Sequence, residues 1–330
     1  MNNVITAGIC ISRNLSDLPF SGLLSDAQRD NLTQRLLGAV KETGISFRYI
    51  PSTILTKSEK NELISKGLIG EETLSAHFDG CFFINADSSV CITAGEEDHI
   101  RIRCSGSDPR EAFRTALEIS AKLAEKMVFA YDSRFGFLTA CPACAGTAMS
   151  ISAVIHLPFI SRRSKNAEYV RRASECSLRL TPVHPENPRN PGDLYTLSTA
   201  FSLGFTESEL LDKICGMLET LNAAEQSLFI ESNEEQQLAL EDRTYRSLAL
   251  LQSARLLTRE EFLQNWSAVR AGCVCGILKL DAVCCNELLF TGLTAPFEQF
   301  ITNENETSPA LAGRAAAVRL FMEKENMKCL

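Results

Sequence analysis

Short apolar runs separated by turn residues place the strongest constraint on the fold of this chain. They cover residues 47–50, 80–86, 89–94 and 100–104, and Asn85-Ala-Asp87-Ser lies between the second and the third. Apolar and polar residues alternate along them, which is typical of strands joined by tight turns. Extended segments at Val4 to Ile11 and Ser150 to Leu157 add strand candidates. The pattern predicts an antiparallel sheet.

Helical periodicity appears in the segments between and after these runs. Asp108 and Pro109 can start a helix, because aspartate caps free amides and proline is tolerated at the first position. Thr206 and Glu209 form a capping-box pattern, and Thr258 begins a second one. The segment Pro182 to Pro191 is predicted to be a loop. The predicted helices cover residues 26–43, 108–130, 206–225 and 310–324.

The distribution of these elements predicts an α+β fold in two parts. A mixed lobe, with an antiparallel sheet flanked by helices, is expected over residues 1–230, and a helical C-terminal lobe over residues 231–330. The 330 residues are enough to bury a large core. The boundary is expected between Ser227 and Gln237.

Charge and hydropathy exclude several classes of partner. The formal net charge of −8 argues against a nucleic-acid binder, since neutralising phosphates requires a basic face. No apolar run approaches the ~20 residues of a membrane span, and the first residues lack the features of a signal peptide. We therefore expect a cytoplasmic protein. A basic cluster including Arg162, Arg163 and Lys165 is either a local binding patch or a solvated surface.

The 13 cysteines do not predict a disulfide framework, because the chain is long and carries no export signal. Most are expected to be small buried apolar side chains. Cys141 and Cys144 have the spacing of a zinc or redox site, but no second pair with this spacing follows. No metal site is predicted.

Two motifs carry a resemblance to a known family. The first is Gly95-Glu96-Glu97-Asp98-His99-Ile100-Arg101 and the second is Cys141-Pro142-Ala143-Cys144-Ala145-Gly146-Thr147. They resemble the facing active-site segments of the ATP:guanidino phosphotransferases, the phosphagen kinases. Further segments fall in the same order, and the chain is most similar to the bacterial protein-arginine kinases of the McsB type. These segments are residues 12–15, 17–20, 131–132, 135–139, 193–195, 203–204, 241–247 and 254–255.

The resemblance implies a phosphagen-kinase-like catalytic lobe and a C-terminal domain of the McsB type. It also implies ATP with magnesium as the cofactor, if the chain is active. Glu97 corresponds to the carboxylate that grips the guanidinium, Glu186 to a second glutamate on a loop, and Cys141 to the cysteine that contacts the substrate. The alternative for Glu97 is a strand-end carboxylate balanced by Arg101 or Arg103.

On the nucleotide side the resemblance assigns Arg101, Thr6, Ser150 and His99. For His99 a structural role is preferred to acid–base chemistry.

The same comparison shows that the expected phosphate clamp is incomplete. Relatives carry Ser-Ser/Thr-Arg-x-Arg where this chain has Thr6 to Cys10, and an arginine where it has Ser150. The loop arginine is missing from Thr181 to Glu186, and a histidine expected near the nucleotide aligns with Gly67. Of five arginines that the resemblance leads us to expect, only Arg101 is present. Each charge-assisted hydrogen bond to phosphate contributes about 1.5–3 kcal/mol, so the loss should cost several kcal/mol.

Two hypotheses follow for function. The favoured one is a degenerate protein-arginine kinase, a pseudokinase that acts as a binding or regulatory protein. Its partners would be a zinc-finger protein of the McsA type and Clp-protease machinery, and a homodimer is also possible. The alternative is an active protein-arginine kinase with replacement cations such as Arg162, Arg163 or Arg189. A purely structural protein is the third hypothesis, and it requires the ordered motif match to be accidental.

The resemblance also concerns regulation. Protein-arginine kinases carry an Arg-Asp-x-x-Arg-Ala element that binds phosphoarginine, and here the corresponding stretch is Ala310 to Ala315, with only Arg314 of its charged residues. Regulation through this element is therefore not expected.

Overall fold

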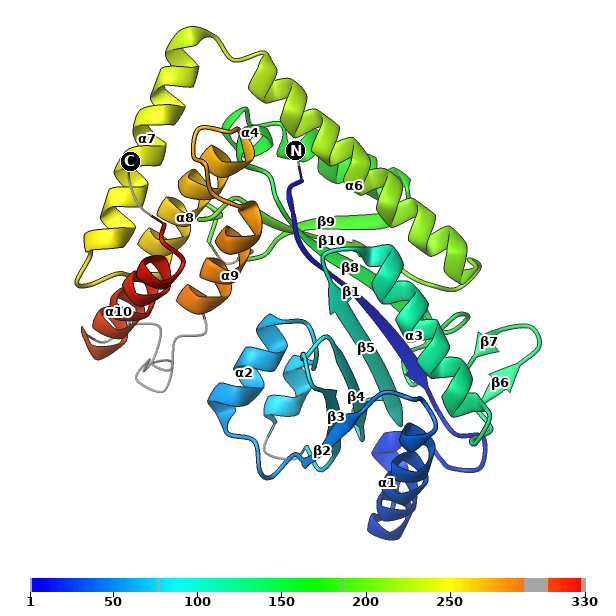
Figure 1. Ribbon diagram of the computed structural model, residues 1–330. Helices are drawn as coiled ribbons and strands as arrows, with labels where there is room; N and C mark the ends of the chain where they lie inside the picture. The colour runs from blue at the N-terminus through cyan, green and yellow to red at the C-terminus, as the bar shows by residue number, and fades with distance from the viewer. Residues whose placement is uncertain (1, 76–77, 186, 294–307, 328–330) are drawn as a thin grey trace.

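A computed structural model describes residues 2–75, 78–185, 187–293 and 308–327. Its centre is an eight-stranded antiparallel sheet with the order β2-β3-β4-β5-β1-β8-β10-β9 (Figure 1). The strands are β1 (Val4–Arg13), β2 (Phe47–Pro51), β3 (Cys81–Asn85), β4 (Val90–Ala94), β5 (Ile100–Gly106), β8 (Met149–His156), β9 (Leu178–Pro182) and β10 (Leu194–Thr199). A separate two-stranded hairpin consists of β6 (Tyr131–Asp132) and β7 (Gly136–Phe137). The predicted antiparallel sheet is confirmed.

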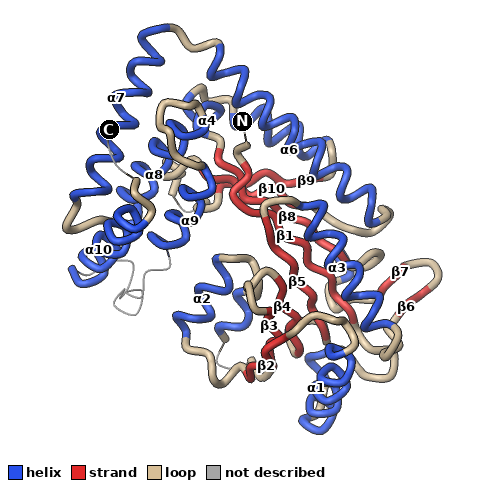
Figure 2. The backbone as a smooth tube through the Cα atoms, viewed as in Figure 1, coloured by secondary structure: helices blue, strands red, loops and turns tan. Residues whose placement is uncertain are grey.

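One face of the sheet is covered by α1 (Asp26–Lys41), α3 (Pro109–Ala124) and α6 (Glu207–Ile230). The alternation of residues along the strands explains this, because Ile9, Ile11, Ile151, Ala153 and Leu197 all belong to the main apolar core. Figure 2 shows the strands as one continuous twisted layer with these helices beside it. Burial of this apolar face is the main force that assembles the lobe.

The opposite face is covered only in part. Helix α2 (Lys57–Ser65) and the turn η2 (Glu71–Leu74) pack over β2, β3 and β4, where Leu68, Phe82 and Cys91 belong to a small apolar cluster. Over β1, β8 and β10 this face presents mostly small polar residues, among them Ser150 and Ser152, which are exposed. We call the exposed part over these three strands the open face.

The C-terminal part consists of helices that pack on one another. Helices α7 (Glu234–Ser253), α8 (Arg259–Val274), α9 (Ala282–Leu293) and α10 (Ser308–Lys324) surround the buried Trp266 (Figure 1). Two short helices, α4 (Pro158–Arg162) and α5 (Asn166–Glu175), follow strand β8. The α+β fold class is thus confirmed, while the division at residue 230 stays a prediction.

A buried polar network connects α8 to the sheet. Arg270 donates to Asn286 Oδ1 at 2.9 Å, to His156 Nδ1 at 3.2 Å and to the backbone oxygens of Asn2 and Val4. Because Nδ1 accepts, the other ring nitrogen of His156 carries the proton and donates to Ser267 Oγ at 2.9 Å. Ser267 in turn donates to Asp193 Oδ2 at 2.6 Å. This network fixes the C-terminal helices against the start of β1 and the end of β8.

Several element boundaries differ from the sequence expectations. The helix expected over residues 108–130 ends at Ala124, because the chain turns back and Phe129 pairs with Leu15. The helix expected over residues 206–225 continues to Ile230, and its predicted capping box at Thr206 is confirmed. Sequence patterns did not predict α2, η2, α4, α5, β9 and β10.

Candidate active site

The turn between β4 and β5 carries the acidic motif. Gly95 begins it with φ +88°, and a Cβ there would lie 3.0 Å from the backbone oxygen of Asp79, so glycine is required. Glu96 and Glu97 follow and line an open pocket of about 510 Å³. The pocket is completed by residues 20–23, Arg29 and Ala140. It is the candidate binding site for a guanidinium substrate.

Glu96 forms a fully buried ion pair beneath this pocket. Its carboxylate is inaccessible to solvent and accepts two hydrogen bonds from Arg103, at 2.5 and 2.7 Å. Burial alone would raise the pKa of Glu96, but the hydrogen bonds and charge of Arg103 overcome it and lower the pKa to about 2. Both hydrogen bonds of Arg103 to Glu96 stabilise the turn between β4 and β5.

We expect this ion pair to make the free energy of unfolding depend on pH. The folded pKa of Glu96 is about 2 and its ordinary value is 4.5, so its stabilisation is complete above pH ~5 and is lost as the pH falls toward 2. The difference corresponds to about 3 kcal/mol. Urea unfolding at pH 6, 4 and 3 measures it. The Glu96→Gln variant should lose this part of the pH dependence, whereas the exposed control Glu118→Gln should keep it. Identical profiles for the wild type and Glu96→Gln would contradict the assignment.

Arg101 is surrounded by carboxylates. Its guanidinium lies 2.5 Å from Glu72, 3.0 Å from Glu96 and 2.9 Å from Glu97, and Asp98 lies at 3.7 Å. Glu72 comes from η2, far from the motif in sequence, and also lies 3.7 Å from Arg103. Arg101, which the resemblance assigns to the nucleotide side, is thus already paired with carboxylates, and Glu97 is one of them.

Asp98 and His99 organise the turn rather than line the pocket. Asp98 Oδ1 accepts from Asn14 at 2.7 Å and from the Ala140 amide at 2.9 Å, which ties the acidic motif to the segment preceding Cys141. His99 accepts at Nδ1 from the Leu15 amide at 2.9 Å and lies 2.7 Å from Pro19 O through Nε2. Both nitrogens are used and the ring is fully buried, which agrees with the structural role preferred for His99, while its assignment to the nucleotide side stays a prediction.

The cysteine motif forms a loop at the same end of the sheet. Cys141 is half-buried and precedes the short turn η3 (Pro142–Cys144), and Cys144 is exposed. Burial and the neighbouring Cys141 raise the pKa of Cys144 to about 11. Gly146, with φ +102°, allows close approach to the backbone of Leu203, 3.1 Å from where a Cβ would lie. The loop is therefore fixed in place.

A buried arginine supports this loop from below. Arg13 donates to the backbone oxygens of Ser12 and Thr147, at 2.8 and 3.1 Å. Its guanidinium carbon lies 3.6 Å from the centre of the Phe137 ring, a cation–π contact. Arg13 is therefore a scaffold for the loop and not a ligand contact.

Two of the residues assigned to the nucleotide side, Ser150 and Thr6, lie on the open face. Ser150 pairs with Cys10, and Cys10 pairs with Arg103 on its other side, so these side chains share one face. Thr6 lies on the same face near the start of β1, toward the opposite end of the sheet from Glu97. The structure therefore brings together Glu97, Arg101 and the Cys141 loop but not Thr6. Glu186 lies outside the described residues.

Sequence analysis named Arg103 only as an alternative partner of Glu97, and it named neither Arg179 nor Glu72. The two-residue spacing of Arg101 and Arg103 puts both side chains on one face of β5, which points to a shared site. Arg179, on the edge strand β9, lies on the same side of the sheet as the open face, because it pairs with Ser198, and Ser198 pairs with Ser152. No local signal points to Glu72, because its contact with Arg101 depends on how η2 packs.

The described residues form neither a cluster of metal-ligating side chains nor a helix that could cross a membrane. No group of three or more His, Cys, Asp or Glu side chains there is arranged to hold a metal ion. Within the same ranges, none of the helices is both long and apolar enough to span a lipid bilayer.

The antiparallel sheet, its helices and the facing motifs define a phosphagen-kinase fold. A lombricine kinase crystal structure matches with a TM-score of 0.59 and 20% identity, covering 70% of this chain and 68% of that one. The substrate-free duplicated taurocyamine kinase from Schistosoma mansoni matches with a TM-score of 0.61 and 17% identity, covering 78% of this chain and 41% of that one.

Sequence comparison then gives the family. The model of the ATP:guanido phosphotransferase C-terminal catalytic domain matches residues 29–228, and the chain belongs to this family. The model of the protein-arginine kinase McsB C-terminal domain matches residues 237–328.

Curated relatives agree with both matches. The protein-arginine kinase of Caldanaerobacter subterraneus is 28% identical over 84% of this chain and 84% of its own length. The protein-arginine kinase of Symbiobacterium thermophilum is 28% identical over 96% of this chain and 92% of its own length. The resemblance stated from the motifs is confirmed.

Proposed function

We propose that this chain is a degenerate protein-arginine kinase, which has lost its ATP phosphate clamp and acts as a binding or regulatory protein. One observation carries the proposal. Arg101 and Arg103 share a cluster with the carboxyl groups of Glu72, Glu96, Glu97 and Asp98. Two guanidiniums face four carboxyl groups, so the cluster has no positive charge to offer a triphosphate.

The strands beside this cluster do not compensate. Throughout β1, β8 and β10, all of whose residues are described, the open face carries no lysine or arginine. Serine and threonine hydroxyls at Thr6, Ser150 and Ser198 can donate hydrogen bonds, but they do not neutralise charge. The residues present therefore do not fit magnesium-bound ATP.

Titration with ATP and magnesium tests this proposal. We expect no saturable binding of magnesium-ATP at micromolar concentrations in isothermal titration calorimetry. An active arginine kinase from the family serves as the positive control. Clear micromolar binding would refute the loss of the clamp.

A phosphoarginine assay tests the chemistry separately. With an arginine-rich protein substrate and ATP, the wild type and Glu97→Ala should give the same background. Phosphoarginine formation that disappears in Glu97→Ala would show that the chain is an active kinase.

The second candidate function, an active protein-arginine kinase, is favoured by Arg179. This residue is exposed on β9, on the same side of the sheet as the open face, two positions before Thr181, where the resemblance leads us to expect an arginine. The other cations suggested as substitutes for the missing clamp arginines are less suitable. Arg162 and Arg163 line a different pocket, and Arg189 lies 3.7 Å from Glu260. If ATP binds, Arg179→Gln should weaken it at least tenfold, by about 1.4 kcal/mol.

In the regulatory role, we propose that the chain acts in the cytoplasm with a zinc-finger partner of the McsA type and a Clp-type protease. The support for this part is the resemblance to protein-arginine kinases that work with such proteins. Co-purification of the full chain with each purified candidate partner tests it. Elution at separate volumes in size-exclusion chromatography, for both partners, would contradict it.

A further inference from the structure

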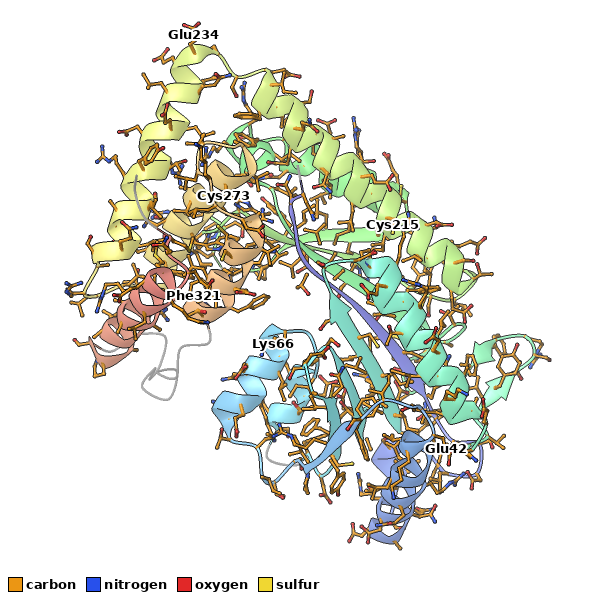
Figure 3. All side chains as sticks on the ribbon, in the orientation of Figure 1. Glu42, Lys66, Cys215, Glu234, Cys273 and Phe321 are labelled. Atoms are coloured by element: carbon orange, nitrogen blue, oxygen red, sulfur yellow. The ribbon has the colours of Figure 1, made fainter. Side chains whose placement is uncertain are left out.

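A second pocket lies at the seam between α4, the end of α6 and the start of α7. Its volume is about 350 Å³. Its lining residues include Phe159, Arg162, Arg163, Phe229, Gln236 and Arg243. Glu234, labelled in Figure 3, marks the bend where α7 begins. We call this the arginine pocket.

The lining of the arginine pocket contains hydrogen-bond donors and cations but no carboxylate. Arg163 donates to Gln236 Oε1 at 3.1 Å, and the Arg162 guanidinium lies 6.0 Å from the centre of the Phe159 ring. Among the described residues, neither Arg162 nor Arg243 forms an ion pair within 4.0 Å. In a chain with a net charge of −8, three arginines that line one pocket with no carboxylate among its lining residues are unusual.

The two buried carboxyl groups whose charges act on Arg162, those of Glu225 and Asp193, form their hydrogen bonds with other groups. Glu225 is fully buried and accepts from the amides of Phe159 and Ile160 at 3.1 and 2.7 Å, and Asp193 accepts from Ser267. Burial, followed by repulsion from Arg243, lowers the pKa of Arg162. An anion placed between these guanidiniums would relieve that repulsion.

The pocket is also held in shape before any ligand arrives. Glu225 anchors the first turn of α4, so the end of that helix presents Arg162 and Arg163 to the pocket. Asn233 caps α7 by accepting from the Gln236 amide at 2.9 Å, which fixes the turn before Arg243. Phe159 and Phe229 pack with ring centres 5.6 Å apart and form an apolar wall. Preorganisation of this kind reduces the entropic cost of binding.

We propose that the arginine pocket binds a small phosphate monoester that carries an aromatic group. Guanidiniums bind phosphate oxygens through paired hydrogen bonds, and three cations match a dianion better than a single carboxylate. The volume exceeds that of a bare phosphate, which leaves room for a ring against Phe159 and Phe229.

This site is separate from the regions already described. It lies beyond the end of β8, whereas Glu97 lies at the other end of the sheet, about 30 Å away along β1 at ~3.3 Å per residue. It also differs from α10, where Arg314 is buried and donates to the backbone oxygens of Gly292 and Leu257. The proposal does not depend on whether the chain turns over ATP.

Calorimetric titration with phenyl phosphate at constant ionic strength tests the site. The wild type should bind phenyl phosphate more tightly than inorganic phosphate or benzoate. Arg162→Gln with Arg243→Gln should lower the affinity by about a hundredfold, roughly tenfold for each guanidinium lost. Replacement of both by lysine should retain part of it.

A matched control removes the same charge elsewhere. Arg171 and Arg246 are exposed and lie 3.7 Å from Glu175 and Asp242. Their double replacement by glutamine should leave the affinity unchanged, and melting curves confirm that every variant folds. Equal losses in the two double variants, or no measurable binding to the wild type, would overturn the proposal. Benzoate binding as tight as phenyl phosphate would overturn the assignment to phosphate.

Discussion

Introducing arginine at positions 8 and 150 is expected to raise the affinity for magnesium-ATP by about a hundredfold. Both positions lie on the open face, where the resemblance leads us to expect phosphate-binding arginines. Each new charge-assisted hydrogen bond should contribute about 1.5–3 kcal/mol, before any loss from non-additivity. A side chain fits at Gly8, because its Cβ would meet only ordinary contacts at 3.8 Å. Calorimetric titration of Gly8→Arg/Ser150→Arg measures the gain.

The control for this gain carries the same two added charges outside the site. Asn31 and Gln34 are exposed on α1, so Asn31→Arg/Gln34→Arg changes the net charge equally. An equal rise in both double variants would mean that net charge attracts ATP, and the proposed clamp would be wrong. No rise in a correctly folded Gly8→Arg/Ser150→Arg variant would mean that the missing arginines are not what limits binding.

Replacement of Arg270 by methionine is expected to destabilise the protein by about 3–5 kcal/mol. The side chain is fully buried, and its loss leaves His156 Nδ1, Asn286 Oδ1 and two backbone oxygens without their donor. These groups connect α8 to β1 and β8, so the C-terminal helices should unfold before the sheet. Trp266 is the single tryptophan and lies in α8, so its fluorescence reports on these helices.

Urea unfolding followed by both fluorescence and circular dichroism distinguishes the outcomes. The two transitions should separate in Arg270→Met, with the fluorescence change first. Arg246→Met, an exposed substitution on α7, should shift the free energy of unfolding by less than about 0.5 kcal/mol. Coincident transitions at the wild-type midpoint would show that Arg270 does not couple the two parts.

The sheet was predictable because burial imposes a strict period on strands with one apolar face. Strand β8 follows that pattern, whereas β3 and β4 are buried on both faces and are recognisable as short apolar runs bounded by turn residues. The strands at 81–85, 90–94 and 100–106 agree with the expected runs within two residues. Thr206 forms the predicted capping box, and Thr258 forms one of the two bonds predicted there, since its Oγ1 accepts from the Glu261 amide at 3.0 Å. These features depend on residues that are close in sequence, so sequence patterns are enough to predict them.

Features that depend on packing were not predictable. The helix after Asp108 stops early although Met127 is apolar and buried, because that side chain enters the core from a turn. Strand β9 is short and ends at Pro182. It is an edge strand that pairs only with β10, so its place in the sheet depends on that non-local contact. Within the candidate site, the motifs identified Glu97 and Arg101. Arg101 pairs directly with Glu97, but its further ion pair with Glu72 depends on how η2 packs beside β5, which no local pattern encodes.

The central position of β1 has a consequence for how the chain folds during synthesis. This strand is made before both of its sheet neighbours, since β5 and β8 lie about one hundred and one hundred and fifty residues later. Both of its edges therefore stay unpaired while much of the chain is still emerging from the ribosome. Such non-local pairing slows folding and exposes strand edges to association with other chains. We expect the nascent N-terminal segment to be the part of this protein most in need of a chaperone.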